Sequence, residues 1–127
     1  MALVFICTPW LNYKEMTNYL AGHAAEQRAA RYLQDQGFKL RELNWHNKLA
    51  EIDIVAEKDG RIFFVEVKYR RNNDQGDGFD YITKAKLKHM QRAANFWIGD
   101  HSHQGEVTLA ALSVSGDEQY EFIEIDS

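Results

Sequence analysis

The chain has 127 residues, of which 45% are hydrophobic and 27% are charged. This length and composition indicate one globular domain with one core, and they argue against a disordered chain. The formal net charge of −4 is unlike that of a strongly basic nucleic-acid-binding protein, and the single cysteine, Cys7, excludes a disulfide within the chain and fits a reducing, cytoplasmic compartment.

Residues 1–15 are expected to be an N-terminal extension that is not part of the core, which leaves residues 16–127 as a single domain. The first ten residues are apolar, but they lack a basic n-region and are too few for a spanning helix. We therefore expect neither a signal peptide nor a membrane anchor.

The first half of the chain predicts a helix followed by three strands. Residues 17–36 are rich in strong helix formers, and Gly37 supplies the stop. Three segments then alternate as strands do, and Asp59-Gly60 has the composition of a tight hairpin turn between the second and the third. The three strands are expected at about 38–46, 49–57 and 61–69.

The second half predicts a polar loop at residues 71–78, a helix from about 80 to 98 that ends at Gly99, and two short strands near 106–114 and 119–125. The order is therefore α-β-β-β-α-β-β. The first three strands can form an antiparallel meander, and the second helix can serve as a crossover to a strand parallel to the third. This predicts an α/β (α+β) domain with a mixed central sheet flanked by helices.

Charged residues interrupt the apolar stripes that both helices should present to the sheet. Glu26 shares the stripe of the first helix with Ala29 and Leu33. Lys86 interrupts the stripe of the second helix in the same way, ahead of Met90. We expect Lys86 to point toward the carboxylates of the neighbouring strands, and we expect Glu26 to lie near the same carboxylates.

The second strand, LAEIDIVAE (49–57), places further acids on the sheet. Strict alternation puts Glu51 and Asp53 on one face, with Ile52 and Ile54 on the other.

The third strand ends in VEVKYRR (65–71), which carries an acid and a base one pleat apart. Alternation directs Val65, Val67 and Tyr69 toward a core, and it puts Glu66 and Lys68 side by side on the opposite face.

Neighbouring antiparallel strands would bring Asp53 close to Glu66. Two carboxylates can hold a hard cation such as Mg²⁺ and leave water positions open, and Lys68 can activate a water or stabilise negative charge on a phosphate. Structural ion pairs are the alternative, with Glu26 bound to Lys86 and with Lys68 neutralising Glu66 or Asp53.

The positive charge is concentrated around these strands. Residues 61–92 carry eight Lys and Arg against four Asp and Glu, whereas residues 93–127 carry seven Asp and Glu and no Lys or Arg. A solvated surface explains such a run, and so does a path for phosphates. The candidate phosphate contacts are Arg70, Arg71, Lys84 and Lys88.

The histidines and the cysteine have no zinc-ligand spacing. His101 and His103 flank Ser102 in what is expected to be a polar turn, which we favour over a metal site.

Asp53 followed by Glu66-Val67-Lys68 resembles the motif of the PD-(D/E)XK nuclease superfamily, whose members share a restriction-endonuclease-like core. Four longer segments occur in order along the chain, and they are AAEQRAARYL (24–33), LNWHNKLAEIDIVAEKDG (43–60), FFVEVKYRR (63–71) and TKAKLKHMQRAANFW (83–97). Together they resemble the YraN-type family of bacterial proteins, which is thought to be related to archaeal Holliday-junction resolvases. The chain departs from that family at Ala50, where glycine is usual, and at VTLAAL (107–112), which lacks the usual Arg-Phe-Asp.

The resemblance implies a role for each matching position. Asp53 and Glu66 are the implied metal ligands, Lys68 the implied catalytic lysine, and Glu26 the glutamate that resolvase-like members place at the site from their first helix. Glu51 matches the family's Gly-Glu-Ile-Asp segment. Lys86 matches a second-helix lysine, and both are expected to support the site.

The leading hypothesis is an endonuclease that uses Mg²⁺ (or Mn²⁺) to hydrolyse DNA, with branched or structured DNA as the expected partner. The alternatives are a nucleic-acid-binding module that does not cut, and a protein-interaction domain whose charges form a structural network. Resolvase-like relatives tend to be dimers, and Phe96 and Trp97 are candidates for an exposed homodimer interface.

Overall fold

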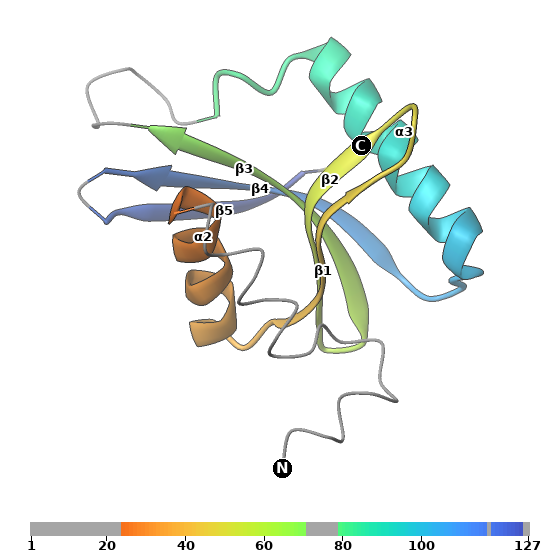
Figure 1. The fold of residues 1–127 in the computed structure, drawn as a ribbon, viewed down its shortest axis with the longest axis horizontal. Helices are drawn as coiled ribbons and strands as arrows, with labels where there is room; N and C mark the ends of the chain where they lie inside the picture. The colour runs from red at the N-terminus through yellow and green to blue at the C-terminus, as the bar shows by residue number, and fades with distance from the viewer. Residues whose placement is uncertain (1–23, 71–78, 117, 126–127) are drawn as a thin grey trace.

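The computed structural model describes residues 24–70, 79–116 and 118–125. The expected extension at residues 1–15 lies outside the described residues, as does the polar loop at 71–78. Within the described part, two helices and five strands follow the chain in the predicted order (Figure 1). The elements are α2 (Ala24–Asp35), β1 (Lys39–His46), β2 (Glu51–Lys58), β3 (Arg61–Arg70), α3 (Lys84–His101), β4 (Val107–Ser115) and β5 (Tyr120–Ile125).

The five strands form one mixed sheet in the order β1-β2-β3-β4-β5. β1, β2 and β3 are an antiparallel meander, β4 runs parallel to β3 after the crossover through α3, and β5 is antiparallel to β4. This confirms the predicted fold class, an α+β domain with the restriction-endonuclease-like arrangement of a mixed sheet and flanking helices.

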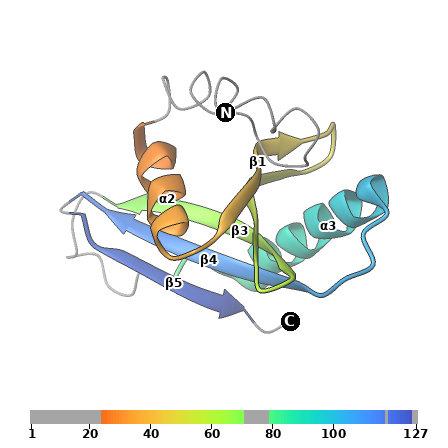
Figure 2. The same cartoon turned by 90° about the horizontal axis from the view of Figure 1, so that it is seen from below.

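The sheet has a core on each face, because α2 covers one face and α3 the other, over different halves of the twisted sheet (Figures 1 and 2). On the α2 side the buried core residues are Ala29, Ala30, Leu33, Phe38, Leu40, Ile54, Ala56, Phe63, Val65, Ala110, Leu112 and Val114. On the α3 side they are Ile52, Val55, Ile62, Phe64, Met90, Ala93, Ala94, Trp97 and Leu109.

Two predicted turns have the backbone that their residues favour. Asp59 and Gly60 both have positive φ, 54° and 78°, as a two-residue hairpin turn with the right twist requires. Gly37 follows α2 with a φ of 95°, and its N–H donates to the carbonyl of Gln34 at 3.0 Å. A left-handed residue after the last turn satisfies carbonyls that the helix leaves open, so Gly37 ends the helix as predicted.

The bounds of the second helix differ from the prediction at both ends. It begins at Lys84 rather than near residue 80, because Thr83 is the N-cap and its Oγ1 accepts from the Lys86 N–H at 3.1 Å. It continues past Gly99 to His101, where Ser102 adopts a left-handed conformation and donates to the Gly99 carbonyl at 3.3 Å. His101 is thus the last helical residue and not part of a polar turn.

The prediction that Ile52 and Ile54 share a face is wrong. Ile52 belongs to the α3-side core and Ile54 to the α2-side core. Both strands change face at the same place, because Leu43 packs on the α2 side and pairs with Ile54, whereas Trp45 packs on the α3 side and pairs with Ile52. On β1 the change falls at Asn44, whose φ of 53° breaks the two-residue alternation, and asparagine tolerates that conformation better than most residues.

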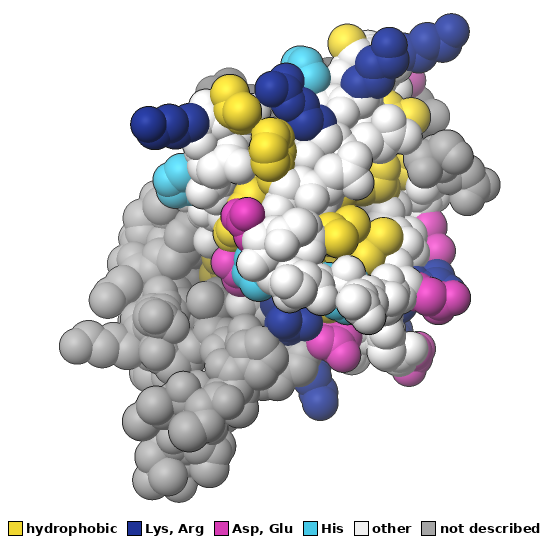
Figure 3. All heavy atoms as spheres, turned by 90° about the vertical axis from the view of Figure 1, so that its right-hand side faces the viewer, with side chains coloured by type: hydrophobic (Ala, Val, Ile, Leu, Met, Phe, Trp, Pro, Cys, Tyr) yellow, Lys and Arg dark blue, Asp and Glu magenta, His cyan; other side chains and the backbone are white. Residues whose placement is uncertain are grey.

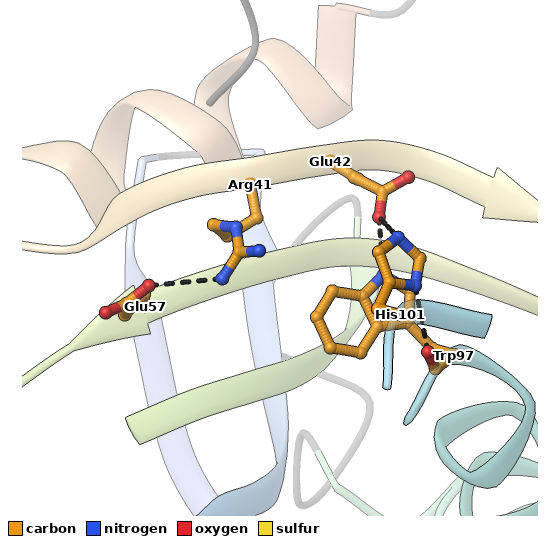
Figure 4. A network of polar contacts seen from close by, with 5 residues as sticks. All are labelled: Arg41, Glu42, Glu57, Trp97 and His101. Atoms are coloured by element: carbon orange, nitrogen blue, oxygen red, sulfur yellow. Dashed lines mark hydrogen bonds and ion pairs between the residues drawn. The ribbon is translucent and has the colours of Figure 1, made fainter. Parts of the chain in front are cut away.

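A buried tryptophan joins α3 to β1 (Figure 4). The Trp97 indole N–H donates to Glu42 Oε2 at 2.5 Å, and the same oxygen lies 2.9 Å from His101 Nε2. The His101 ring stacks on Trp97 at 4.0 Å, and the Arg41 guanidinium lies 5.5 Å from the centre of the indole. Because Trp97 is 0% exposed, the expectation that it could form an open interface is wrong.

We expect Glu42→Ala to lower the free energy of unfolding by about 1–3 kcal/mol, because the Trp97 indole N–H would stay buried without an acceptor. Urea unfolding near neutral pH measures the change. Glu42→Gln is the matched control, since its amide oxygen can still accept from the indole. An alanine variant as stable as the glutamine variant would contradict this role for Glu42.

Candidate active site

The candidate site lies at a fork in the sheet. The pairing of β2 with β3 ends at Ile54–Val65, whereas β3 continues to Arg70 beside β4. Beyond the fork, the Val67 N–H donates to Asp53 Oδ2 at 2.8 Å. The carboxylate of Asp53 therefore takes the place of a strand carbonyl at the point where β2 leaves β3.

The Asp53 carboxylate is held in an unfavourable environment for negative charge. Burial is the largest cause and the charge of Glu66 the second, and together they raise the pKa of Asp53 from its ordinary value of 3.8 to about 6. The Val67 N–H and the Lys86 charge oppose this rise, while the exposed Glu51 adds to it. The sequence prediction that these acids lie close together is therefore confirmed for Asp53, Glu66 and Glu51.

Lys86 points to the carboxylates, as predicted from its position in the apolar stripe of α3. Its Nζ lies 2.9 Å from Glu66 Oε2. It therefore pairs with Glu66 and not with Glu26, the structural alternative considered from the sequence. The two side chains are 36% and 20% exposed, so water screens the pair and the contact orients Glu66 more than it stabilises the fold.

Lys68 is exposed, and no ion pair joins it to Glu66 or Asp53, so the alternative in which Lys68 neutralises these acids is wrong. Its Nζ instead lies 5.6 Å from the centre of the Tyr81 ring. Val65 is buried in the α2-side core and Val67 packs against that core, as alternation predicts. Glu66 and Lys68 thus emerge on the α3 side of β3.

Tyr81 belongs to the candidate active site, although the sequence did not predict it. Its hydroxyl is buried without a hydrogen-bond partner in the described part of the chain. Burial, followed by the charges of Glu66 and Asp53, raises the pKa of Tyr81, which places the phenol beside the carboxylates. An uncharged aromatic residue after a polar loop carries no pattern from which this position could be predicted.

Glu26 lies in the first turn of α2 and is half-buried. It makes no ion pair with any residue in the described ranges, and its placement near Asp53 and Glu66 stays a prediction.

Of the two arginines expected to contact phosphates, Arg71 lies outside the described ranges, while Arg70 is the last residue of β3.

Lys84 and Lys88 are both exposed on α3. Basic side chains gather along the upper edge of this face of the molecule, at the end where α3 begins (Figures 1 and 3). Contact of these side chains with nucleic acid stays a prediction.

A hollow of about 240 Å³ opens beside the fork. Larger hollows of about 390 and 500 Å³ lie elsewhere, so volume alone does not identify the hollow beside the acids. The smaller hollow is lined by the carboxylates of Glu51 and Glu66 and by the ammonium group of Lys86. Its lining residues are Leu49, Ala50, Glu51, Glu66, Lys86, His89, Met90 and Arg92.

The side chains fit a cation that keeps most of its ligands from water and substrate. Among the described residues, no group of three or more His, Cys, Asp and Glu side chains is arranged to hold a metal. Mg²⁺, however, is commonly bound through one or two carboxylates plus phosphate and water oxygens. Asp53 and Glu66 supply such a pair, and the raised pKa of Asp53 marks negative charge that a cation would offset.

The mixed five-stranded sheet with a helix on each face has the arrangement of a restriction-endonuclease-like core. The chain belongs to the Uncharacterised protein family UPF0102, whose profile matches residues 25–125. This is the YraN-type family that the sequence indicated, and that recognition is confirmed.

Relatives in three organisms cover most of the chain. UPF0102 protein FN1370 of Fusobacterium nucleatum is 35% identical over 98 residues, which are 76% of this chain and 82% of the relative. A UPF0102 protein of Cytophaga hutchinsonii is 33% identical over 103 residues, 81% of this chain and 91% of the relative. A UPF0102 protein of Neisseria meningitidis serogroup C is 35% identical over 112 residues, 84% and 94% respectively.

Neither described helix is long and apolar enough to cross a membrane.

We expect Asp53→Asn to stabilise the metal-free protein at about pH 8 by up to about 3 kcal/mol. The folded state raises the pKa of Asp53, so between about pH 4 and 6 it binds more protons than the unfolded state, and stability falls as the pH rises through this window. The asparagine has no charge to lose and can still accept from Val67.

Urea unfolding in chelator at about pH 4 and pH 8 measures this difference. Glu121→Gln is the control, because Glu121 is exposed on β5 and is not among the charges that raise the pKa of Asp53, so it should change stability little at either pH. A stability gain for Asp53→Asn that does not shrink at the lower pH would contradict the raised pKa.

Proposed function

We propose that the protein is a metal-dependent endonuclease that hydrolyses phosphodiester bonds in DNA. One observation carries the proposal, namely a half-buried acid pair, Asp53 and Glu66, beside a lysine, Lys68, that pairs with neither acid. Lys86 neutralises only one of the two acids, so the arrangement leaves one negative charge for a cation and the positive charge of Lys68 for a phosphate, whereas a structural network would neutralise its charges internally.

Asp53 and Glu66 would hold the cation, Mg²⁺ or Mn²⁺. Such a cation supplies Lewis acidity and a readily ionised water. The protein's own contribution is orientation. The Val67 N–H fixes one oxygen of Asp53, and the Lys86 ammonium fixes one oxygen of Glu66, so each carboxylate has a defined direction before substrate arrives. Lys86 is therefore a positioning residue.

Lys68 would contact the reacting phosphate. Its ammonium group is exposed on the same side of β3 as Glu66, one pleat away. A fixed positive charge near the phosphate stabilises the negative charge that develops as water attacks, and typical losses on removing such a group are about 10²–10³-fold in rate.

Binding of the DNA backbone falls to the basic side chains around the fork. Lys84 and Lys88 project from the first turns of α3, and Arg70 ends the strand that carries Glu66 and Lys68. Contacts of this kind go to phosphates and carry no sequence information, so selectivity would come from DNA structure. The net charge of −4 favours modest affinity, and the fall of that affinity with salt would scale with the number of phosphates that these side chains neutralise.

Cleavage of linear, flapped and four-way DNA in Mg²⁺, Mn²⁺ or chelator tests the proposal. We expect cleavage that needs the metal, and a loss of about a hundredfold or more in Lys68→Ala with little change in DNA affinity. Lys48→Ala is the matched control, because it removes an exposed lysine from the β1–β2 turn.

A protein that binds DNA and cuts none of these substrates would favour the non-catalytic nucleic-acid-binding module. A protein that neither binds nor cuts would favour the protein-interaction domain. A Lys68→Ala variant that cuts as fast as the parent would remove Lys68 from the chemistry.

A further inference from the structure

The α2 side of the sheet ends in a row of aromatic residues close to the fork. Tyr69 on β3 pairs in register with Val114 on β4, which pairs in turn with Tyr120 on β5. Val114 is in the α2-side core and Tyr120 packs against that core, so the register puts Tyr69 on the same face. Tyr69 is therefore on the opposite face of β3 from its neighbour Lys68.

An arginine from α2 joins these rings into one stack. The Tyr32 ring lies on the Tyr120 ring at 4.5 Å and 9°. The Arg28 guanidinium lies 5.9 Å from the centre of Tyr120 and 5.7 Å from the centre of Tyr69. Hydrogen bonding to Tyr120 is the largest of the effects that raise the pKa of Arg28, and Tyr69 contributes as well, so both phenols face the cation.

The stack is anchored at Arg28 and open to solvent at Tyr69. Arg28 donates to the carbonyl of Ser115 at 2.8 Å, which ties the guanidinium to the end of β4. Tyr69 is the last ring of the series and is 44% exposed, although the sequence pattern directed it toward a core. Tyr69 thus offers an aromatic ring beside a cation to solvent, which is what a stacking ligand requires.

We propose that Tyr69 and Arg28 form a stacking platform for an unpaired base of the DNA substrate. The inference rests on the proposed function and narrows its substrate class to DNA with an unpaired nucleotide next to the site of cleavage. The end of β3 would thus contact both strands of the DNA. Phosphates would lie on the Lys68 face of the sheet, and a displaced base would lie on the Tyr69 face.

The chemistry of the patch favours a base over another occupant. Aromatic rings take bases of any identity by stacking, and an adjacent guanidinium adds cation–π attraction. Arg28 and Arg70 also give this end of β3 the positive charge that a polyanion requires. A duplex offers no free base face away from its ends, so the platform would discriminate by structure and not by sequence.

Binding measured in chelator, so that no DNA is cut, tests the platform. The probes are a duplex and a forked duplex of the same length whose first unpaired nucleotide is 2-aminopurine. We expect the parent to bind the forked DNA about tenfold more tightly than the duplex and to quench the 2-aminopurine. Tyr69→Ala should lose both effects, whereas Tyr69→Trp should keep them.

Two controls separate the platform from general binding. Ile123→Ala removes another exposed apolar side chain, on β5, and should change neither affinity. The double variant Lys84→Ala, Lys88→Ala should weaken both DNAs alike and reduce the salt dependence of each by about one unit of slope for each phosphate that the variant no longer neutralises.

Several results would overturn the platform. These are equal affinity of the parent for both probes, unchanged quenching in Tyr69→Ala, and an equal loss for both probes in that variant. Because binding is measured without metal, a forked-DNA preference that depends on Tyr69 would support the platform even if cleavage were never found. A parent that binds neither probe would overturn the platform and the proposed function together.

Discussion

The hydrogen bond from the Val67 N–H to the Asp53 carboxylate is the constraint on which the candidate site depends. It closes the gap where β2 leaves β3, and without it the backbone N–H of Val67 would face the fork unsatisfied. Because the Asp53 side chain takes the place of a strand carbonyl, its charged carboxylate is also fixed beside Glu66. The end of the pairing between β2 and β3 and the raised pKa of Asp53 therefore have the same structural origin.

The helices on the two faces of the sheet each bring a basic side chain to the end of β3, Lys86 from α3 and Arg28 from α2. α3 is tied to β1 near its C-terminal end by the contact between Trp97 and Glu42, and in its first turn Lys86 reaches Glu66 on β3. On the other face, α2 carries Arg28 against the aromatic row that ends at Tyr69. Both helices are therefore fixed by buried or stacked aromatic side chains, and each presents a cation near the end of β3. The repulsion between Asp53 and Glu66 is the cost of this arrangement in the metal-free state.

The sequence predicted the order of elements, the mixed sheet and the direction of Lys86, because each of these follows from local periodicity. Alternation in VEVKYRR placed Val65 and Val67 correctly, and the charged residue in the apolar stripe of α3, Lys86, points to Glu66 as predicted. It failed at Ile52, because β2 changes face together with β1 at the place where Asn44 on β1 is left-handed. No pattern within β2 itself carries that information.

Contacts that depend on tertiary packing were also beyond prediction. Glu42 and Trp97 are far apart in sequence. Neither the apolar stripe of a helix nor the alternation of a strand predicts that the Trp97 indole N–H donates to the Glu42 carboxylate. The position of Tyr81 also depends on tertiary packing. It follows from where α3 begins, after the N-cap Thr83, and no sequence motif includes Tyr81 itself. The exposure of Tyr69 went unpredicted because alternation gives the face of a residue and not where the covering helix stops.

The most direct test of the candidate metal site is an NMR titration of the side-chain carboxyl carbon of Asp53, in chelator and in saturating Mg²⁺. We expect a midpoint at about pH 6 in chelator, because burial and Glu66 both oppose ionisation. We expect a lower midpoint with Mg²⁺, because cation and proton compete for the same oxygens. A midpoint near the ordinary value of 3.8 that Mg²⁺ does not move would contradict a metal site at Asp53 and Glu66.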